Sequence, residues 1–118
     1  MNKRTNEVDR LKHLIADLEP EVSTTEAESI PLANQLHAVN AAIVSADATL
    51  RQPYSYPAHR DAQEAKSAAY SQRGALAEQI QENKQRTNTL KGRLAELRQT
   101  LARAEYEAVS TAELRGKL

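Results

Sequence analysis

The sequence contains no cysteine, no tryptophan and no phenylalanine, and four tyrosines are its only aromatic residues. Without cysteine the chain offers no disulfide framework, and without large rings it has little material for a compact aromatic core. No apolar run approaches the roughly 18 residues that a membrane-spanning helix needs, and the first ten residues lack the apolar core of a signal peptide. We therefore expect a cytoplasmic protein that does not enter a membrane.

The chain has no net charge of either sign, because sixteen basic residues balance sixteen acidic ones. Bulk charge therefore gives no reason to expect binding to a polyanion. The three glycines are isolated and form no phosphate-binding loop. What dominates instead is Ala, Leu, Glu, Gln and Arg, a composition typical of long helices and coiled coils. The sequence predicts an all-α protein with a single domain over residues 1–118.

The clearest pattern lies between Ile80 and Ala104, where one position in every three or four belongs to a regular series. Its members are Ile80, Asn83, Thr87, Leu90, Leu94, Leu97, Leu101 and Ala104. This is a heptad seam, and a helix that carries it needs a partner helix to cover the seam.

A second series with the same alternation runs through the first half of the chain. It comprises Val8, Leu11, Ile15, Leu18, Val22, Thr25, Ser29, Leu32, Leu36, Val39, Ile43, Ala46 and Leu50. Pro20 and Pro31 interrupt it, and a proline inside a helix kinks or breaks it. Either one long helix bends at these prolines, or two helices flank an irregular link near residues 20–31. We favour helical segments laid end to end, kinked or broken near Pro20 or Pro31.

Two further prolines, Pro53 and Pro57, mark a turn between the halves. We expect helix 1 over about residues 5–51, a turn over 52–59, helix 2 over about 60–107 and a C-terminal tail over 108–118. If helices 1 and 2 fold back on each other, residues equidistant from residue 56 face one another. Apolar positions then meet apolar positions, as in the pairs Ile43 with Ala69 and Leu18 with Leu94.

The polar positions of the two series also coincide, since Thr25 then faces Thr87 and Ser29 faces Asn83. Facing polar groups can satisfy one another, whereas a lone buried hydroxyl costs on the order of 1–3 kcal/mol. Matched polar layers of this kind fix register.

Charge supports the same alignment. It predicts four ion pairs between the helices, namely Glu19 with Lys91, Glu26 with Lys84, Glu21 with Arg93, and Glu28 with Arg86. Each exposed pair contributes only about 0.2–1 kcal/mol, but together they select orientation. The predicted fold is an elongated antiparallel helical hairpin of the coiled-coil type.

The half of the hairpin near the turn is rich in alanine, and Ile30 and Val44 fall outside the seam there. Small residues widen the apolar face beyond what two helices cover. We therefore expect a homo-oligomer, with a dimeric helical bundle as the first choice.

Catalysis and metal binding find no support. The three histidines, His13, His37 and His59, have no His or Cys three or four residues away. Two helices alone form no concave pocket for a nucleophile. We predict no catalytic residue, no metal ligand and no cofactor, and so no enzyme.

Two surfaces remain as candidates for binding a partner. The turn carries Arg51, Tyr54, Tyr56, His59 and Arg60, types that are favoured at protein interfaces and that also stack on bases. Alternatively, the tyrosines pack back on the helices. The C-terminal end of the chain, from Glu105 to Leu118, presents Tyr106, Val109 and Leu114, which have no partner within the chain and either fray or dock on another molecule.

These features predict a protein that binds another protein, as an adaptor, a scaffold or stalk, or a small inhibitor of a protein complex, through the turn, the Ala-rich flank or the tail. The alternative is a nucleic-acid-associated protein that uses Lys84–Arg103 and the turn. That basic segment is largely matched by the acidic residues between Glu19 and Glu28, and the net charge is zero.

Overall fold

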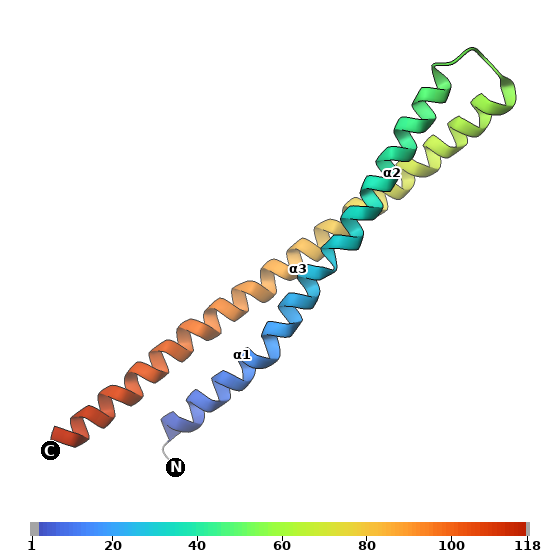
Figure 1. Cartoon of the computed structure of the whole chain (residues 1–118). Helices are drawn as coiled ribbons and strands as arrows, with labels where there is room; N and C mark the ends of the chain where they lie inside the picture. Colours follow the sequence, from blue (N-terminus) through green and yellow to red (C-terminus); the bar gives the residue numbers. More distant parts are fainter. Residues whose placement is uncertain (1–2, 118) are drawn as a thin grey trace. The chain divides into compact units, whose positions relative to one another are not determined.

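The computed structural model describes residues 3–117 and contains three α-helices over that range (Figure 1). They are α1 (Lys3–Ala27), α2 (Ser29–Leu50) and α3 (Tyr56–Lys117). No strand occurs among these residues. The all-α prediction is confirmed, with two helices that follow each other directly and a third of 62 residues.

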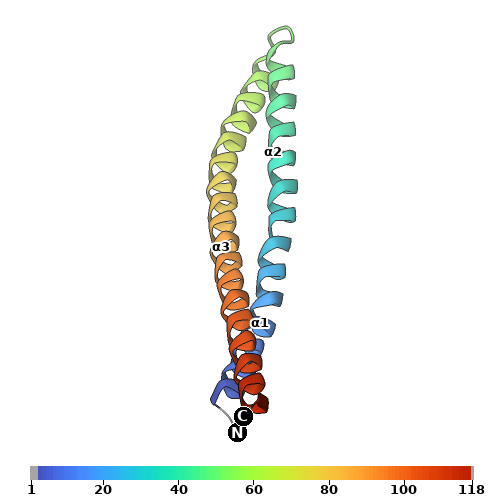
Figure 2. The same ribbon diagram turned by 90° about the vertical axis from the view of Figure 1, so that its left-hand side faces the viewer.

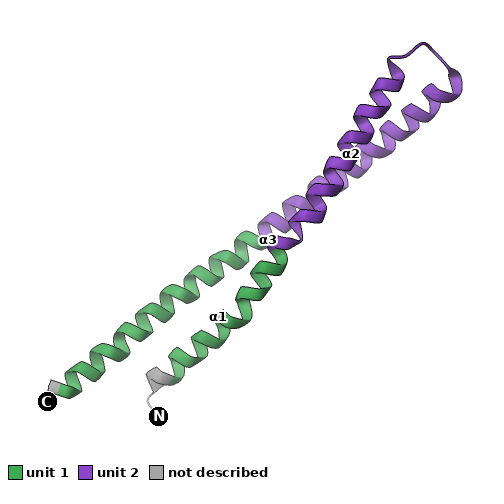
Figure 3. Ribbon diagram, viewed as in Figure 1, with its two compact units in different colours: residues 1–25, 86–118 green, residues 26–85 purple. Residues whose placement is uncertain are grey.

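The chain divides into two compact units, and α3 contributes to both (Figure 3). Unit 1 takes the described residues within 1–25 and 86–118, and so contains most of α1 and the second half of α3. Unit 2 takes residues 26–85, with α2, the turn and the first half of α3. Each unit has its own core.

The core of unit 1 is built from large aliphatic side chains. Its buried members are Ile15, Leu18 and Val22 from α1 and Leu90 and Leu94 from α3, and Leu97 and Leu101 pack against them. All belong to the two predicted heptad series. Burying each such side chain contributes about 1.5–3 kcal/mol, which holds the two helices together along this seam.

The core of unit 2 combines large and small residues. Val39 and Ile43 of α2 meet Ala69 and Leu76 of α3, with Leu32 packed alongside. In this half of α3 one residue per heptad is buried, in the series Ala62, Ala69, Leu76 and Asn83. Ala65 and Gln72 lie between them at the same spacing of three and four residues but are exposed, so the buried stripe is narrower here than a full heptad seam.

The polar positions of the seams behave differently from one another. Thr25 and Asn83 are buried, and the Thr25 hydroxyl donates to the Glu21 carbonyl at 2.8 Å. Ser29 is exposed, and its hydroxyl donates to the Glu26 carbonyl at 2.6 Å. Ser29 therefore does not share a buried layer with Asn83 as predicted, because its hydroxyl finds an acceptor on its own backbone.

The first half of the chain is interrupted at one residue, Glu28, between α1 and α2. The alternative of an irregular link over residues 20–31 does not hold, since Glu28 keeps helical dihedrals (φ −61°, ψ −21°) and Pro20 lies inside α1. The favoured prediction, helical segments laid end to end, agrees with α1 and α2. The interruption has a local cause. Pro31 has no N–H to donate to the carbonyl of Ala27, the residue at which α1 ends. A bend at Pro20 or Pro31 stays a prediction.

The second long helix extends further than predicted at both ends. It begins at Tyr56 rather than near residue 60 and so includes Pro57 in its first turn. A proline is tolerated there because N–H groups of the first turn have no intrahelical acceptor. At the other end α3 continues to Lys117, so the segment predicted as a separate tail is helical. Residues 108–115 contain no Gly or Pro to stop it.

Replacing Leu18, which is 6% exposed in the core of unit 1, with alanine should lower the free energy of unfolding of that unit by about 2–5 kcal/mol. The matched control is Leu14→Ala on the same helix, where the side chain is 40% exposed and the loss should stay below about 1 kcal/mol. Urea denaturation followed by circular dichroism measures both. Equal losses would contradict the assigned core.

Pro31→Ala should restore a helical N–H opposite the Ala27 carbonyl and join α1 to α2 in one hydrogen-bonded ladder. We expect a gain of about 1–3 kcal/mol in stability, since a proline inside a helix costs about 3 kcal/mol. Hydrogen exchange by NMR should find the amide introduced at position 31 protected. Pro53→Ala in the turn is the control and should give no gain, because it only frees the unfolded chain. A rapidly exchanging amide at position 31 would show that Pro31 is not the cause of the interruption.

Candidate interaction surface at the turn

The turn begins at the C-terminal end of α2, where Arg51 and Gln52 are the last residues whose N–H groups bond back to the helix. The Arg51 and Gln52 N–H groups bond back to the carbonyls of Asp47 and Thr49, each at 3.1 Å, and so close the last turn of α2. Pro53 follows and cannot extend the helix. The chain then reaches Ser55 without regular structure and enters α3.

His59 fixes the start of α3. Its backbone N–H donates to the Ser55 carbonyl at 2.8 Å, the first bond of the helix. Its ring folds back as well, with Nδ1 at 3.1 Å from both the N–H and the carbonyl oxygen of Ser55. An unprotonated Nδ1 accepts from the Ser55 N–H, and a protonated Nδ1 donates to the Ser55 carbonyl. In either form the imidazole ties Ser55 to the helix.

The two tyrosines of the turn point to solvent and are held by neighbours from α3. The Tyr54 ring lies 5.1 Å from the His59 ring at an interplanar angle of 41°. The Arg60 guanidinium lies over the Tyr56 ring at 5.8 Å from its centroid, within range of a cation–π contact. Tyr54 is 76% exposed and Tyr56 is 62% exposed. Both rings therefore contact side chains of α3 and still present most of their surface to solvent.

The positive charge of the turn is partly compensated. Arg60 lies 3.9 Å from the Asp61 carboxylate and 4.0 Å from that of Glu64. Arg51 is exposed at the end of α2. The structure thus brings Tyr54 to His59 and Tyr56 to Arg60. The exposed tyrosine rings are the main feature of this surface, and its positive charge is secondary because it is partly neutralised.

One contact near the turn has no counterpart among the predicted ion pairs. Lys66 Nζ of α3 lies 2.6 Å from the Asp47 carboxylate of α2, with each side chain about one-third exposed. The hydrogen bond and the charge of Asp47 raise the pKa of Lys66 above its ordinary value. Lys66 also lies 5.9 Å from the Tyr70 ring, and Arg73 lies 4.5 Å from the same ring. The sequence contained a signal for this ion pair. Asp47 is the one charged residue of α2, and Asp47 and Lys66 lie at nearly equal distances along the chain from residue 56, the centre of the predicted hairpin.

Among the predicted ion pairs, Glu19 has a different partner. Its carboxylate lies 3.5 Å from Arg98, which is one heptad further along α3 than the predicted Lys91. Both side chains of this pair are more than half exposed. The pairs predicted for Glu21, Glu26 and Glu28 stay predictions.

The three residues proposed from the other end of the chain, Tyr106, Val109 and Leu114, are exposed on the last turns of α3. They belong to one continuous helix, and their docking on another molecule stays a prediction. Residues 108 and 111, which lie between them, are half-buried.

Within residues 3–117, no group of three or more His, Cys, Asp or Glu side chains is placed to hold a metal ion. Nor does any of the helices described combine the length and apolarity that crossing a membrane requires. Comparison of the chain with protein-family models, with curated proteins and with solved structures gives no match.

Asp47→Asn should lower the pKa of Lys66 toward its ordinary value, because it removes the charge that favours the protonated ammonium. The raised pKa means that the contribution of this pair to stability is complete below the pKa of an unfolded lysine and is lost as pH rises through the folded value. Asp47→Asn should therefore be less stable than the wild type at neutral pH, and most of this difference should disappear at strongly alkaline pH. Titration of the Lys66 side chain by NMR measures the shift, and an unchanged pKa in the variant would show that Asp47 is not its cause.

Proposed function

We propose that the protein is a non-enzymatic protein–protein interaction module, an antiparallel helical hairpin of the coiled-coil type that binds another protein through its turn. The observation that carries this proposal is the pair of exposed tyrosine rings, Tyr54 and Tyr56, each placed against a cationic or imidazole side chain of α3. Arg51 adds an exposed positive charge beside them.

The arrangement suits an interface because the tyrosine side chains lose little conformational entropy when a partner binds. A tyrosine offers about 150–250 Å² of surface for burial and has few rotatable bonds. The contacts with His59 and Arg60 restrict these rings before a partner arrives. Tyrosine and arginine are also the residue types most enriched among those that dominate binding energy.

The rest of unit 2 supports such a role by holding the two sides of the turn together. The Asp47–Lys66 contact joins α2 to α3 about one helical turn before the end of α2 and almost three turns after the start of α3. The buried Ala46 and Ala62 lie in the same region, and the cluster around Ile43 and Ala69 follows. A turn supported in this way can serve an adaptor, a scaffold or stalk, or a small inhibitor of a protein complex.

A nucleic-acid-binding role is the second candidate, because exposed tyrosines beside arginine also stack on bases. Its electrostatic basis is weak. Arg60 is shared with Asp61 and Glu64, Arg98 of the basic segment Lys84–Arg103 lies beside Glu19, and the net charge is zero. Without a surplus of cations facing the backbone phosphates, affinity for nucleic acid stays low at physiological salt.

The test is affinity capture with the full chain, followed by titration of the captured protein against the variants by biolayer interferometry. Tyr54→Ala/Tyr56→Ala should weaken binding about thirtyfold or more, which corresponds to about 2 kcal/mol for the loss of one dominant contact. Tyr106→Ala is the matched control, since it removes a tyrosine that is 73% exposed at the far end of α3, and should bind as the wild type does.

Two outcomes would go against the proposal. If the double variant retains every partner, the turn is not the binding surface. If capture disappears after nuclease treatment and falls by about 10³-fold or more between 50 and 200 mM salt, the nucleic-acid role is correct instead.

A further inference from the structure

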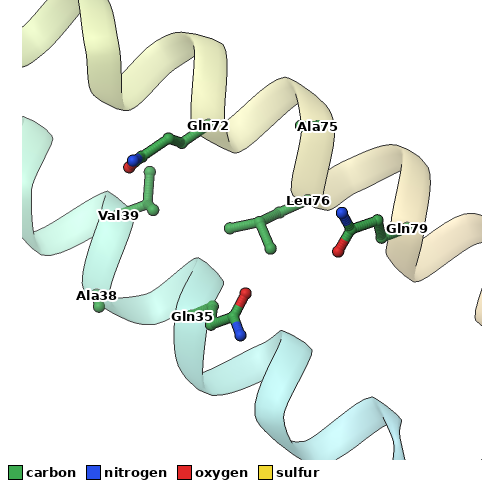
Figure 4. A pocket seen from close by; sticks show the side chains of 7 residues that line it. All are labelled: Gln35, Ala38, Val39, Gln72, Ala75, Leu76 and Gln79. Carbon is green, nitrogen blue, oxygen red and sulfur yellow. The ribbon is translucent and has the colours of Figure 1, made fainter.

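Unit 2 contains a shallow groove of about 390 Å³ between α2 and α3 (Figure 4). Its floor is formed by Val39 and Leu76, and its rims carry alanines and glutamines. The full lining is Gln35, Ala38, Val39, Gln72, Ala75, Leu76 and Gln79. None of these seven residues is charged, in a sequence of which 27% is charged.

The helix α2, which forms one side of this groove, has few charged residues, as is typical of a helix that is covered on more than one face. Only Asp47 among the 22 residues of α2 is charged. Ile30 and Val44 are exposed on α2, outside the core that Val39 and Ile43 form with α3. A helix that is apolar on several faces is typically surrounded by other helices.

We propose that the groove packs against the same groove of a second copy of this chain, so that two copies of unit 2 form a four-helix bundle around a twofold axis. A twofold interface brings identical patches together, so the patch must be complementary to itself. A cluster of charges of one sign fails that requirement. A glutamine amide meets it, because it both donates and accepts and can pair with its own copy.

The shape of the groove fits the same occupant. Ala38 and Ala75 lie on opposite rims, and side chains this small allow helices to approach closely. Figure 4 shows the side chains of Gln35, Gln72 and Gln79 extending over the space between the two helices. On the second copy, the same amides would be the nearest polar groups, and the alanines would cover Val39 and Leu76.

Light scattering coupled to size exclusion, at tens of micromolar, should give about 26 kDa, twice the 13.1 kDa of one chain. Ala75→Arg places a charge inside the groove and should weaken the dimer about 100-fold or more. The control is Ala77→Arg, an equally exposed alanine about 200° further round α3, which should remain dimeric. Circular dichroism checks that both variants keep their helix content.

A wild type of 13.1 kDa at this concentration would overturn the proposal. So would a dimer that Ala75→Arg leaves intact, since the contact would then lie elsewhere. A different protein seated in the groove would appear as a monomeric wild type with a binding partner that Ala75→Arg loses, and this would also refute self-association.

A second measurement locates the contact without adding charge. Because the chain has no cysteine, Ala75→Cys and Ala77→Cys each introduce a single thiol. Alkylation of the thiol at position 75 should slow severalfold when the protein is concentrated through the dimerisation range, while the rate at position 77 stays constant. Equal rates at all concentrations would place the groove outside any interface. The turn is untouched in these variants, so failure here leaves the proposed binding through Tyr54 and Tyr56 standing.

Discussion

The apolar seam of α3 has to be covered, and the rest of the structure depends on that requirement. The helix carries charged residues on its other faces, and the tertiary packing of an amphipathic face is what stabilises such a helix in water. In unit 1 α1 supplies the cover with Ile15, Leu18 and Val22, and in unit 2 α2 supplies it with Val39 and Ile43. The turn brings the chain back so that α2 can cover α3, and it also carries two of the exposed tyrosines, Tyr54 and Tyr56.

The two units satisfy the requirement to different degrees. Unit 1 joins large leucines across the seam and places charges such as Glu19 and Arg98 outside it, which leaves its outer faces suited to water. Unit 2 buries one small or medium residue per heptad of α3 and leaves uncharged alanines and glutamines beside the seam. Residues that are neither buried in the core nor charged are what the proposed second copy of unit 2 would cover. This contrast is the reason to look for self-association in unit 2.

The prolines show how strongly position decides the effect of one residue type. Pro31 lies in the first turn of α2 and leaves the carbonyl of Ala27, the last residue of α1, without its helical donor, yet the dihedrals of Glu28 remain helical. Pro57 has no such effect, because it lies in the first turn of α3 where no intrahelical acceptor is available. Pro53, between α2 and α3, lies where the chain leaves helical geometry altogether.

Heptad spacing predicted that this chain is helical and which residues form the core of unit 1, because burial of an apolar stripe is dictated by helix periodicity. In unit 2 it predicted too many buried positions, since Ala65 is exposed. It determined much less about polar groups. Ser29 occupies a seam position but is exposed, since a nearby backbone carbonyl accepts its hydroxyl hydrogen. Glu19 lies beside Arg98, one heptad beyond the predicted Lys91, and exposed pairs are too weak for spacing to specify one partner. Only the folded structure decided that Tyr54 and Tyr56 face solvent and that Asp47 meets Lys66, since these depend on the exact path of the turn and on rotamers that spacing does not specify.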